Sequence, residues 1–147
     1  MESYKHILLA VDFFEPAQIV IDRAKALADI YKATLSLIHV VDSMPFPDTS
    51  YGLDTAYNVD LTGEMIAAAR KKLSDLAINL SVEQDHTWVE LGNPNLEITR
   101  IAEENQVDLI VVGSHGRHGL SLLLGSTANG VLHHAKCDVL AVRLQDK

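Results

Sequence analysis

A loop in the second half of the chain combines glycines with basic side chains, a combination that suits phosphate groups. Its glycines and basic residues are Gly113, His115, Gly116, Arg117, His118 and Gly119. Glycine tolerates positive φ and lets a ligand reach the backbone without meeting a Cβ, so successive N–H groups can point at one anion. The loop therefore predicts an anion site. A plain strand-to-helix connection stays the alternative, because neither the dinucleotide-binding GxGxxG pattern nor the P-loop pattern is present.

A second turn built from small residues follows a few positions later. Gly125, Ser126 and Thr127 come just before a helical pattern. The free N–H groups and the dipole at the start of a helix favour phosphate. Two turns that suit an anion therefore flank one loop.

Metal binding and hydrolysis are less well supported by the same residues. His115 and His118 have the spacing of a metal pair on a helix, but no nearby Cys, Asp or Glu completes a site in the loop. Ser114 and Ser126 lie near His115 in the sequence, yet there is no GxSxG elbow and no carboxylate placed to orient the imidazole. His39 lies within an apolar strand and is expected to be a hydrogen-bonded core residue. We predict no catalytic residue and no metal site.

Strand patterns and helix patterns alternate along the whole chain. The expected strands span residues 7–11, 34–41, 86–91, 109–112 and 139–144, and the expected helices span about 16–32, 61–80, 94–105 and 121–135. Segment 42–60 has no periodicity and is expected to be a long loop that could cover a site. In the helix over 61–80, the expected buried stripe is Met65, Ala69, Leu73, Leu76 and Leu80.

This alternation predicts an α/β fold with a doubly wound five-stranded parallel sheet and helices on both faces. Ligands of such sheets bind beyond the carboxyl ends of the strands. Those ends lie here at residues 10–12, 40–42 and 113–119. The anion loop is therefore expected to meet the ends of the first and second strands.

Composition excludes several classes of function. The 147 residues suit a single domain, and the chain carries 12 basic against 20 acidic residues for a formal net charge of −8. Such a charge argues against general binding to nucleic acid or acidic membranes. The sequence shows no signal-peptide layout, no apolar run long enough to span a membrane and a single cysteine, Cys137. We expect a cytoplasmic protein.

Four stretches of the sequence together resemble the universal stress protein family over nearly the whole chain. They are YKHILLAVD from Tyr4, SLIHV from Ser36, GNP from Gly92 and DLIVVGSHGR from Asp108. The resemblance implies a Rossmann-like sheet of strand order 3-2-1-4-5 over residues 1–147, and ATP bound at the strand ends in one subgroup. It also implies a homodimer formed through the last strand, from Val139 to Leu144.

Carried over by position, the resemblance assigns parts of an ATP site to this sequence. The residues that would hold the phosphates and the ribose are Gly113, Gly116, Arg117, Gly125, Ser126 and Thr127. His115 and His118 would add side-chain donors beside them. Asp12 and Val40 would meet the adenine side, and Ala10 would line the pocket.

The sequence departs from the ATP motif of the family in two places. Eight residues separate Gly116 from Gly125, one fewer than in the motif, and Phe14 stands where members usually carry a small or hydroxyl residue. One missing residue shortens an extended loop by up to ~3.5 Å. Phe14 could crowd the site or pack beneath the first helix.

Three functions remain open at this point. Binding of ATP as a regulatory ligand, with or without Mg²⁺, is favoured because the glycines of the motif are kept. A slow ATPase would need a residue that positions water and usually Mg²⁺, and Asp12 is the only carboxylate suitably placed for the metal. A dimeric stress-response scaffold without nucleotide follows if the short loop or Phe14 closes the pocket.

Overall fold

The computed structural model describes residues 3–13, 18–42, 53–114 and 126–144, with the backbone alone for 53–61 and 126. The strands are β1 (His6–Ala10), β2 (Thr34–Asp42), β3 (Thr87–Gly92), β4 (Leu109–Gly113) and β5 (Asp138–Val142). The helices are α1 (Gln18–Tyr31), α2 (Leu53–Leu80), α3 (Pro94–Glu104) and α4 (Ser126–His134), and a short 3₁₀ turn, η1 (Gln84–His86), precedes β3.

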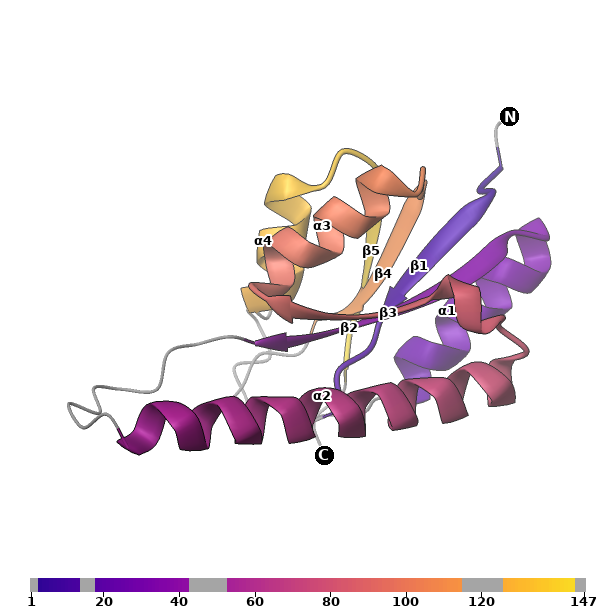
Figure 1. The fold of residues 1–147 in the computed structure, drawn as a ribbon. Coiled ribbons are helices and arrows are strands. Elements are labelled where there is room, and N and C mark those ends of the chain that lie inside the picture. The colour runs from indigo at the N-terminus through magenta and orange to yellow at the C-terminus, as the bar shows by residue number, and fades with distance from the viewer. Residues whose placement is uncertain (1–2, 14–17, 43–52, 115–125, 145–147) are drawn as a thin grey trace.

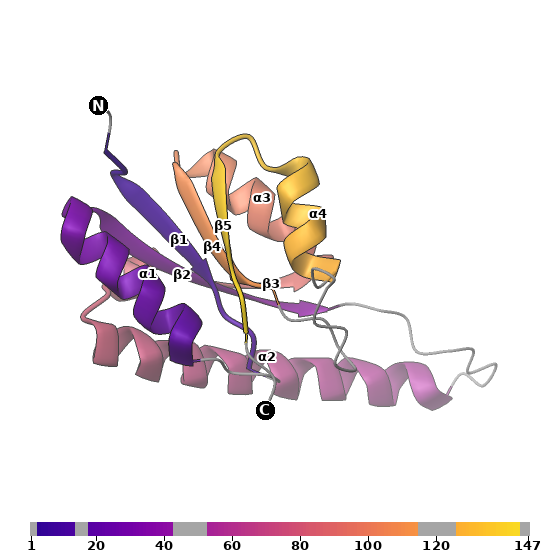
Figure 2. The same cartoon turned by 180° about the vertical axis from the view of Figure 1, so that it is seen from behind.

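The five strands form one parallel sheet in the order β3-β2-β1-β4-β5. Helices α1 and α2 cover one face of the sheet, and α3 and α4 cover the other (Figures 1 and 2). This arrangement confirms the doubly wound fold and the strand order expected from the sequence. It also brings the carboxyl ends of all five strands to one edge of the sheet.

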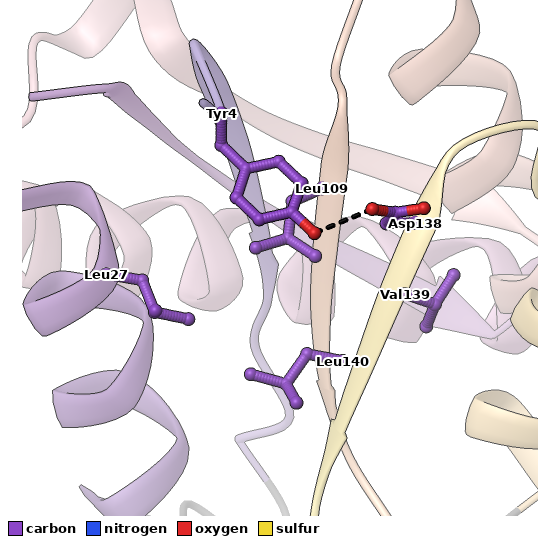
Figure 3. Close-up of a pocket in the computed structure, with 6 residues that line it drawn as sticks. All are labelled: Tyr4, Leu27, Leu109, Asp138, Val139 and Leu140. Carbon is purple, nitrogen blue, oxygen red and sulfur yellow. Dashed lines mark hydrogen bonds between the residues drawn. The ribbon is translucent and has the colours of Figure 1, made fainter. Parts of the chain in front are cut away.

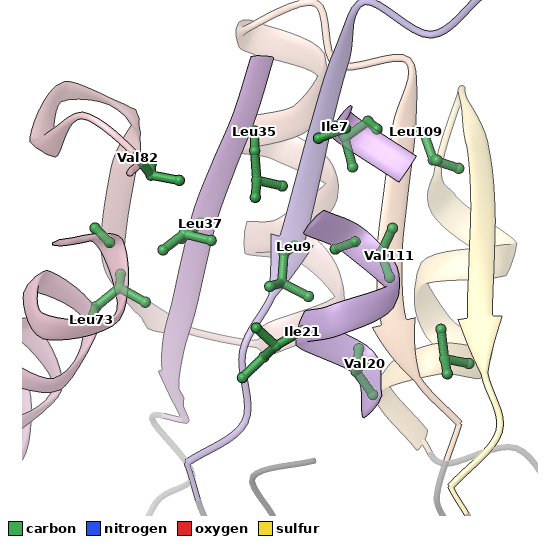
Figure 4. Packing of buried hydrophobic residues seen from close by; sticks show 14 residues of the cluster. Ile7, Leu9, Val20, Ile21, Leu35, Leu37, Leu73, Val82, Leu109 and Val111 are labelled. Carbon is green, nitrogen blue, oxygen red and sulfur yellow. The ribbon is translucent and has the colours of Figure 1, made fainter. Parts of the chain in front are cut away.

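The core has two layers because successive strand residues point to opposite faces. Ile7 and Leu9 of β1 pack toward α1 and α2 (Figure 4), whereas Leu8 packs toward α3 and α4. All three side chains are fully buried. Burial on both faces explains why the strand sequences are unbroken apolar runs instead of alternating patterns.

The turn before α3 shows how local chemistry starts a helix. Gly92 has a φ of 150°, in a region that L side chains rarely adopt. The Asn93 side chain then accepts hydrogen bonds from the backbone N–H groups of Asn95, at 2.9 Å, and Leu96, at 3.4 Å. Pro94 occupies the first helical turn, where its missing N–H does no harm. Gly-Asn-Pro therefore ends β3 and begins α3 within three residues.

The structure corrects two expectations about α2. The helix begins at Leu53, so residues 53–60 are helical and not part of a long loop, while 43–52 lie outside the described residues. The helix breakers Pro45, Pro47 and Gly52 all precede this start, and Gly63 is tolerated inside the helix.

The buried stripe of α2 also differs from the expected one. Among the α2 side chains that the structure describes, Ala69, Leu73 and Ala77 are buried, whereas Met65 is 38% exposed. Leu76 and Leu80 are partly buried and pack against the core, as predicted. The amino-terminal turns of α2 run past the carboxyl end of β2 (Figure 1). Among the described residues, no helix is both long and apolar enough to cross a membrane.

Candidate functional site

The carboxyl ends of β1, β2 and β4 lie side by side in the centre of the sheet. Ala10 pairs with Ile38 across β1 and β2, and Leu9 pairs with Val111 across β1 and β4. The backbone N–H of Val11 donates to the Ile38 carbonyl over 2.8 Å, which continues the β1–β2 pairing up to the residue before Asp12. The sheet therefore brings Asp12, Val40 and Gly113 to one edge, as the sequence predicts.

Two of the expected residues form an apolar wall on one face of this edge. Ala10 and Val40 are both partly buried, and both pack against the cluster that lies between the sheet and helices α3 and α4. Asp12 follows β1 at the same edge and is exposed. The described part of the candidate site thus combines a small apolar surface with the exposed carboxylate of Asp12.

Gly113 ends β4 at the expected place, and its hydrogen in the Cβ position faces α1. A Cβ there would lie 3.4 Å from both Val20 Cγ2 of α1 and Leu144 Cδ1. Among the glycines that the structure describes, only Gly92 has a positive φ, so Gly113 does not depend on a left-handed conformation. The two 3.4 Å separations are ordinary van der Waals distances, so the packing around Gly113 does not require a glycine.

Helix α4 begins at the same edge of the sheet. It starts with Ser126 and Thr127, the second of which is partly buried, and runs back toward the amino edge (Figure 2). It packs closely beside α3 at Gly130, where a Cβ would collide with the Asn95 side chain. The free N–H groups at the start of α4 are therefore presented at the carboxyl edge.

Several expected site residues lie outside the described residues. They are His115, Gly116, Arg117, His118 and Gly125, together with Phe14 and the side chain of Ser126. Their assignment to the phosphates and to pocket crowding stays a prediction.

His39 lies in β2 next to Val40, on the opposite face of the sheet. It is a hydrogen-bonded core residue, as predicted. Its side chain is buried, and Nδ1 donates to the Val11 carbonyl over 2.7 Å. The Phe13 ring packs on the imidazole with 4.5 Å between centroids, and Lys72 Nζ of α2 lies 5.6 Å from the Phe13 centroid. The sequence did not predict the contacts of Phe13 and Lys72. The available signal was His39, a polar residue among the apolar residues of β2.

A second polar cluster occupies the opposite, amino edge of the sheet. His6 Nδ1 donates to the Asn105 carbonyl over 3.0 Å, and Ser36 Oγ donates to His6 Nε2 over 2.6 Å. Burial holds the pKa of His6 below its usual value. Ser36 is fully buried, so no substrate could reach this Ser–His pair. The pair is a structural element and not a nucleophile.

A shallow hollow of about 410 Å³ lies at this amino edge between α1 and β5 (Figure 3). Its walls are mostly apolar: Leu27, Leu109, Val139 and Leu140. The Tyr4 hydroxyl donates to Asp138 Oδ2 over 2.6 Å across the opening, and this hydrogen bond raises the pKa of Tyr4 to about 12. The hollow is at the far end of the strands from the candidate site, so the two are separate.

The described residues do not suggest a metal centre. No group of three or more His, Cys, Asp or Glu side chains in this part of the chain is arranged to hold a metal ion. Burial also raises the pKa of the Cys137 thiol, which disfavours the thiolate that a metal would need.

Known proteins are similar to this chain in sequence and in fold. Universal stress protein A homolog 2 of Coxiella burnetii is 42% identical over 146 residues, which cover 99% of this chain and 99% of that protein. The solved structure of hypothetical protein MJ0577 superposes with a TM-score of 0.79 at 28% identity, over 99% of this chain and 100% of that one.

A universal stress protein solved in complex with cAMP has a TM-score of 0.63 at 23% identity, over 96% of this chain and 98% of that one. At that identity it shows the shared fold alone. A sequence model of the universal stress protein family matches residues 3–143. With the family model and the Coxiella relative both covering nearly its whole length, the chain belongs to the universal stress protein family.

Proposed function

We propose that this chain binds an adenine nucleotide at the carboxyl edge of its sheet and uses it as a regulatory ligand. The observation that carries the proposal is the meeting of Ala10, Val40 and Asp12 at one edge, next to the start of α4. The two apolar side chains offer a surface for a base. The Asp12 carboxylate can accept hydrogen bonds from an amino group or ribose hydroxyls, and the α4 N–H groups suit phosphate.

Residues outside the described ranges would complete the phosphate part of this site. By resemblance, these are Gly116, Arg117, Gly125 and Ser126, with His115 and His118 as further donors. The net charge of −8 does not prevent binding of an anion, because charges more than about 8–10 Å away are largely screened. Local N–H groups and one arginine can then dominate.

Binding without rapid turnover is the form of the proposal that the site chemistry supports. Hydrolysis of ATP needs a residue that positions water and usually Mg²⁺. Asp12 is the only carboxylate among the proposed ligand residues. A single carboxylate that binds the adenine or the ribose is not also available to hold Mg²⁺ and to position the attacking water. We therefore expect any ATPase activity to be slow.

We also propose that the protein is a cytoplasmic, single-domain homodimer that pairs through β5. The two open edges of the sheet differ in a way that supports this. On the β3 edge, Glu90 forms an ion pair with Arg100 at 2.8 Å, and a charged edge discourages pairing with another chain. On the β5 edge, Val139, Leu140 and Ala141 are only partly buried, and no charged side chain lies between Asp138 and Arg143. The β5 edge is the one suited to a second copy.

Calorimetric titration of the nucleotide-stripped protein with ATP, ADP and cAMP, each with and without Mg²⁺, tests the nucleotide proposal. We expect micromolar or tighter binding of ATP. Ala10→Leu should weaken ATP binding roughly tenfold or more, because the longer side chain occupies the space in which the adenine base would lie. Ala26→Leu makes the same change on the exposed side of α1 and should leave the affinity unchanged.

The opposite result would support the scaffold alternative. If none of the three nucleotides binds and none is found in the protein as isolated, the short loop or Phe14 closes the pocket. Phosphate release measured on the same samples separates a ligand from a substrate, and turnover within seconds would contradict a purely regulatory role.

A further inference from the structure

The residue before Asp12 is held by β2 through two hydrogen bonds. The Val11 N–H donates to the Ile38 carbonyl over 2.8 Å, and the Val11 carbonyl accepts from His39 Nδ1 over 2.7 Å. Strand β1 itself ends at Ala10. The His39 imidazole therefore adds a side-chain hydrogen bond between β2 and Val11, which lies beyond the end of β1 and directly before Asp12.

The residue after Asp12 contacts the same imidazole. The Phe13 ring packs on His39 with a centroid separation of 4.5 Å and an interplanar angle of 43°. Lys72 Nζ approaches the Phe13 ring at 5.6 Å from its centroid, and Phe13 packs against the core cluster under α1 and α2. Asp12 is thus bracketed by two residues that both contact His39.

His39 cannot itself contact a ligand bound on the proposed face. In β2, Ile38 and Val40 face α3 and α4, so the intervening His39 faces α1 and α2. Its side chain is 9% exposed. Any influence of His39 on a ligand must therefore pass through the backbone of Val11 and the turn that carries Asp12.

We infer that His39 is a positioning residue that sets the place of the Asp12 carboxylate in the nucleotide site; this inference rests on the proposed function. Because a carbonyl can only accept, Nδ1 must carry a hydrogen. Loss of that donor leaves a partly buried carbonyl without this partner and leaves the Phe13 ring without the surface on which it packs. The turn is then held by one hydrogen bond and one ring contact fewer, and a directional contact from Asp12 to the nucleotide is weakened.

Two substitutions separate the hydrogen bond from the volume of the side chain. In His39→Asn the side-chain amide nitrogen lies near the position of Nδ1, so a donor to Val11 is kept. His39→Leu keeps an apolar volume but has no donor. His86→Leu removes a different partly buried histidine, in η1 at the other edge of the sheet, and serves as the matched control.

The experiment measures ATP affinity by calorimetry and the amide signals of Asp12 and Phe13 by ¹H–¹⁵N NMR of the ligand-free protein. We expect His39→Leu to weaken ATP binding roughly tenfold or more and to shift both amide signals. His39→Asn should restore affinity to within about threefold of the original chain and move the signals back. His86→Leu should change neither.

The other possible results either contradict the role of His39 or test it separately from nucleotide binding. If His39→Leu folds and binds ATP as tightly as the original chain, His39 does not position Asp12. If the original chain binds no nucleotide, the proposed function fails, and the amide signals alone decide whether His39 holds the turn. If His39→Leu does not fold, His39→Asn is compared with His39→Gln, whose amide lies one bond further out. Equal affinities of these two variants would then overturn the inference.

Discussion

The His6 imidazole links three segments by hydrogen bonds at the amino edge of the sheet. His6 in β1 bonds to Ser36 of β2 through Nε2 and to the Asn105 carbonyl, just after α3, through Nδ1. The Asp108 carboxylate accepts from the backbone N–H groups of Lys5 and His6 at 2.9 and 3.0 Å. Because a carbonyl can only accept, Nδ1 carries a hydrogen, and in the neutral ring that the lowered pKa of His6 favours, Nε2 accepts from the Ser36 hydroxyl.

The pH dependence of stability should therefore contain a contribution from His6. Burial lowers its folded pKa below the ordinary 6.5, the His86 ring at 6.2 Å lowers it further, and Asp108 and the Asn105 bond oppose the shift. Below pH 6.5 the unfolded chain binds the proton first. The contribution is therefore complete above pH 6.5 and is lost as the pH falls toward the folded pKa.

Chemical unfolding between pH 7 and pH 5, with an NMR titration of the His6 ring, measures this contribution. His6→Leu should lower the free energy of unfolding at pH 7 by about 1–3 kcal/mol, since the Ser36 hydroxyl and the Asn105 carbonyl lose a partner. The variant should also show a shallower decline toward pH 5. A His6 ring that titrates at or above 6.5 would contradict the prediction.

Tyr4 should contribute to the pH dependence of stability at alkaline pH. Its hydrogen bond to Asp138 raises the folded pKa from 10.0 to about 12. The stabilisation is complete below pH 10 and is lost as the pH rises from 10 toward about 12. Tyr4→Phe should therefore differ from the original chain by a constant amount up to pH 10, and the difference should shrink above it.

Alkaline unfolding curves of Tyr4→Phe and of a matched variant check this. Tyr31 packs edge-on to Tyr4 with 5.2 Å between ring centroids, and Tyr31→Phe keeps that ring contact. It should retain the alkaline decline of the original chain. Equal declines in Tyr4→Phe and the original chain would show that the hydrogen bond to Asp138 contributes no pH-dependent stability.

The elements of the fold could be predicted because their sequence signals are local. The apolar run over β4 and the turn at Gly92-Asn93-Pro94 each lie within a few residues. The start of α2 at Leu53 was not predicted because Pro45, Pro47 and Gly52 made segment 42–60 resemble one loop, whereas all three residues precede the helix. The bond from His39 to Val11 spans 28 positions and depends on strand register, so sequence spacing alone could predict a buried partner but not which one.

The pairing of α3 with α4 gives a prediction at the scale of elements. Gly130 lies in the middle of α4, and a Cβ there would collide with the Asn95 side chain of α3. Alanine in a helix is favoured over glycine by roughly 0.5–1 kcal/mol. Overpacking a tight contact commonly costs about 1–3 kcal/mol, so Gly130→Ala should be destabilising in net terms.

A double-mutant cycle separates the two effects. In the Asn95→Ala background the collision is absent, and Gly130→Ala should there be neutral or stabilising by roughly 0.5–1 kcal/mol. Urea unfolding of the four proteins measures the coupling. Additive effects would mean that Asn95 turns aside freely and that Gly130 does not set the distance between the helices.

At the scale of the whole molecule, the proposed dimer depends on the open edge of β5. The Ser114 N–H donates to the Val142 carbonyl over 2.8 Å, so the backbone groups of Val142 face β4. Those of the preceding residue, Ala141, then face the open edge. An outward N–H on a partly buried, uncharged strand is what a second copy needs for pairing.

Ala141→Pro should therefore yield monomers without unfolding the sheet. Proline removes the outward donor, and an edge strand tolerates it better than a central one. Ala141→Ser keeps the N–H and should remain dimeric. Sedimentation velocity gives the assembly state, circular dichroism checks the fold, and ATP titration of the Ala141→Pro monomer shows whether each copy holds its own site. A folded Ala141→Pro dimer would place the interface elsewhere, whereas a monomer that binds ATP as well as the dimer would show that the nucleotide site is complete within one chain.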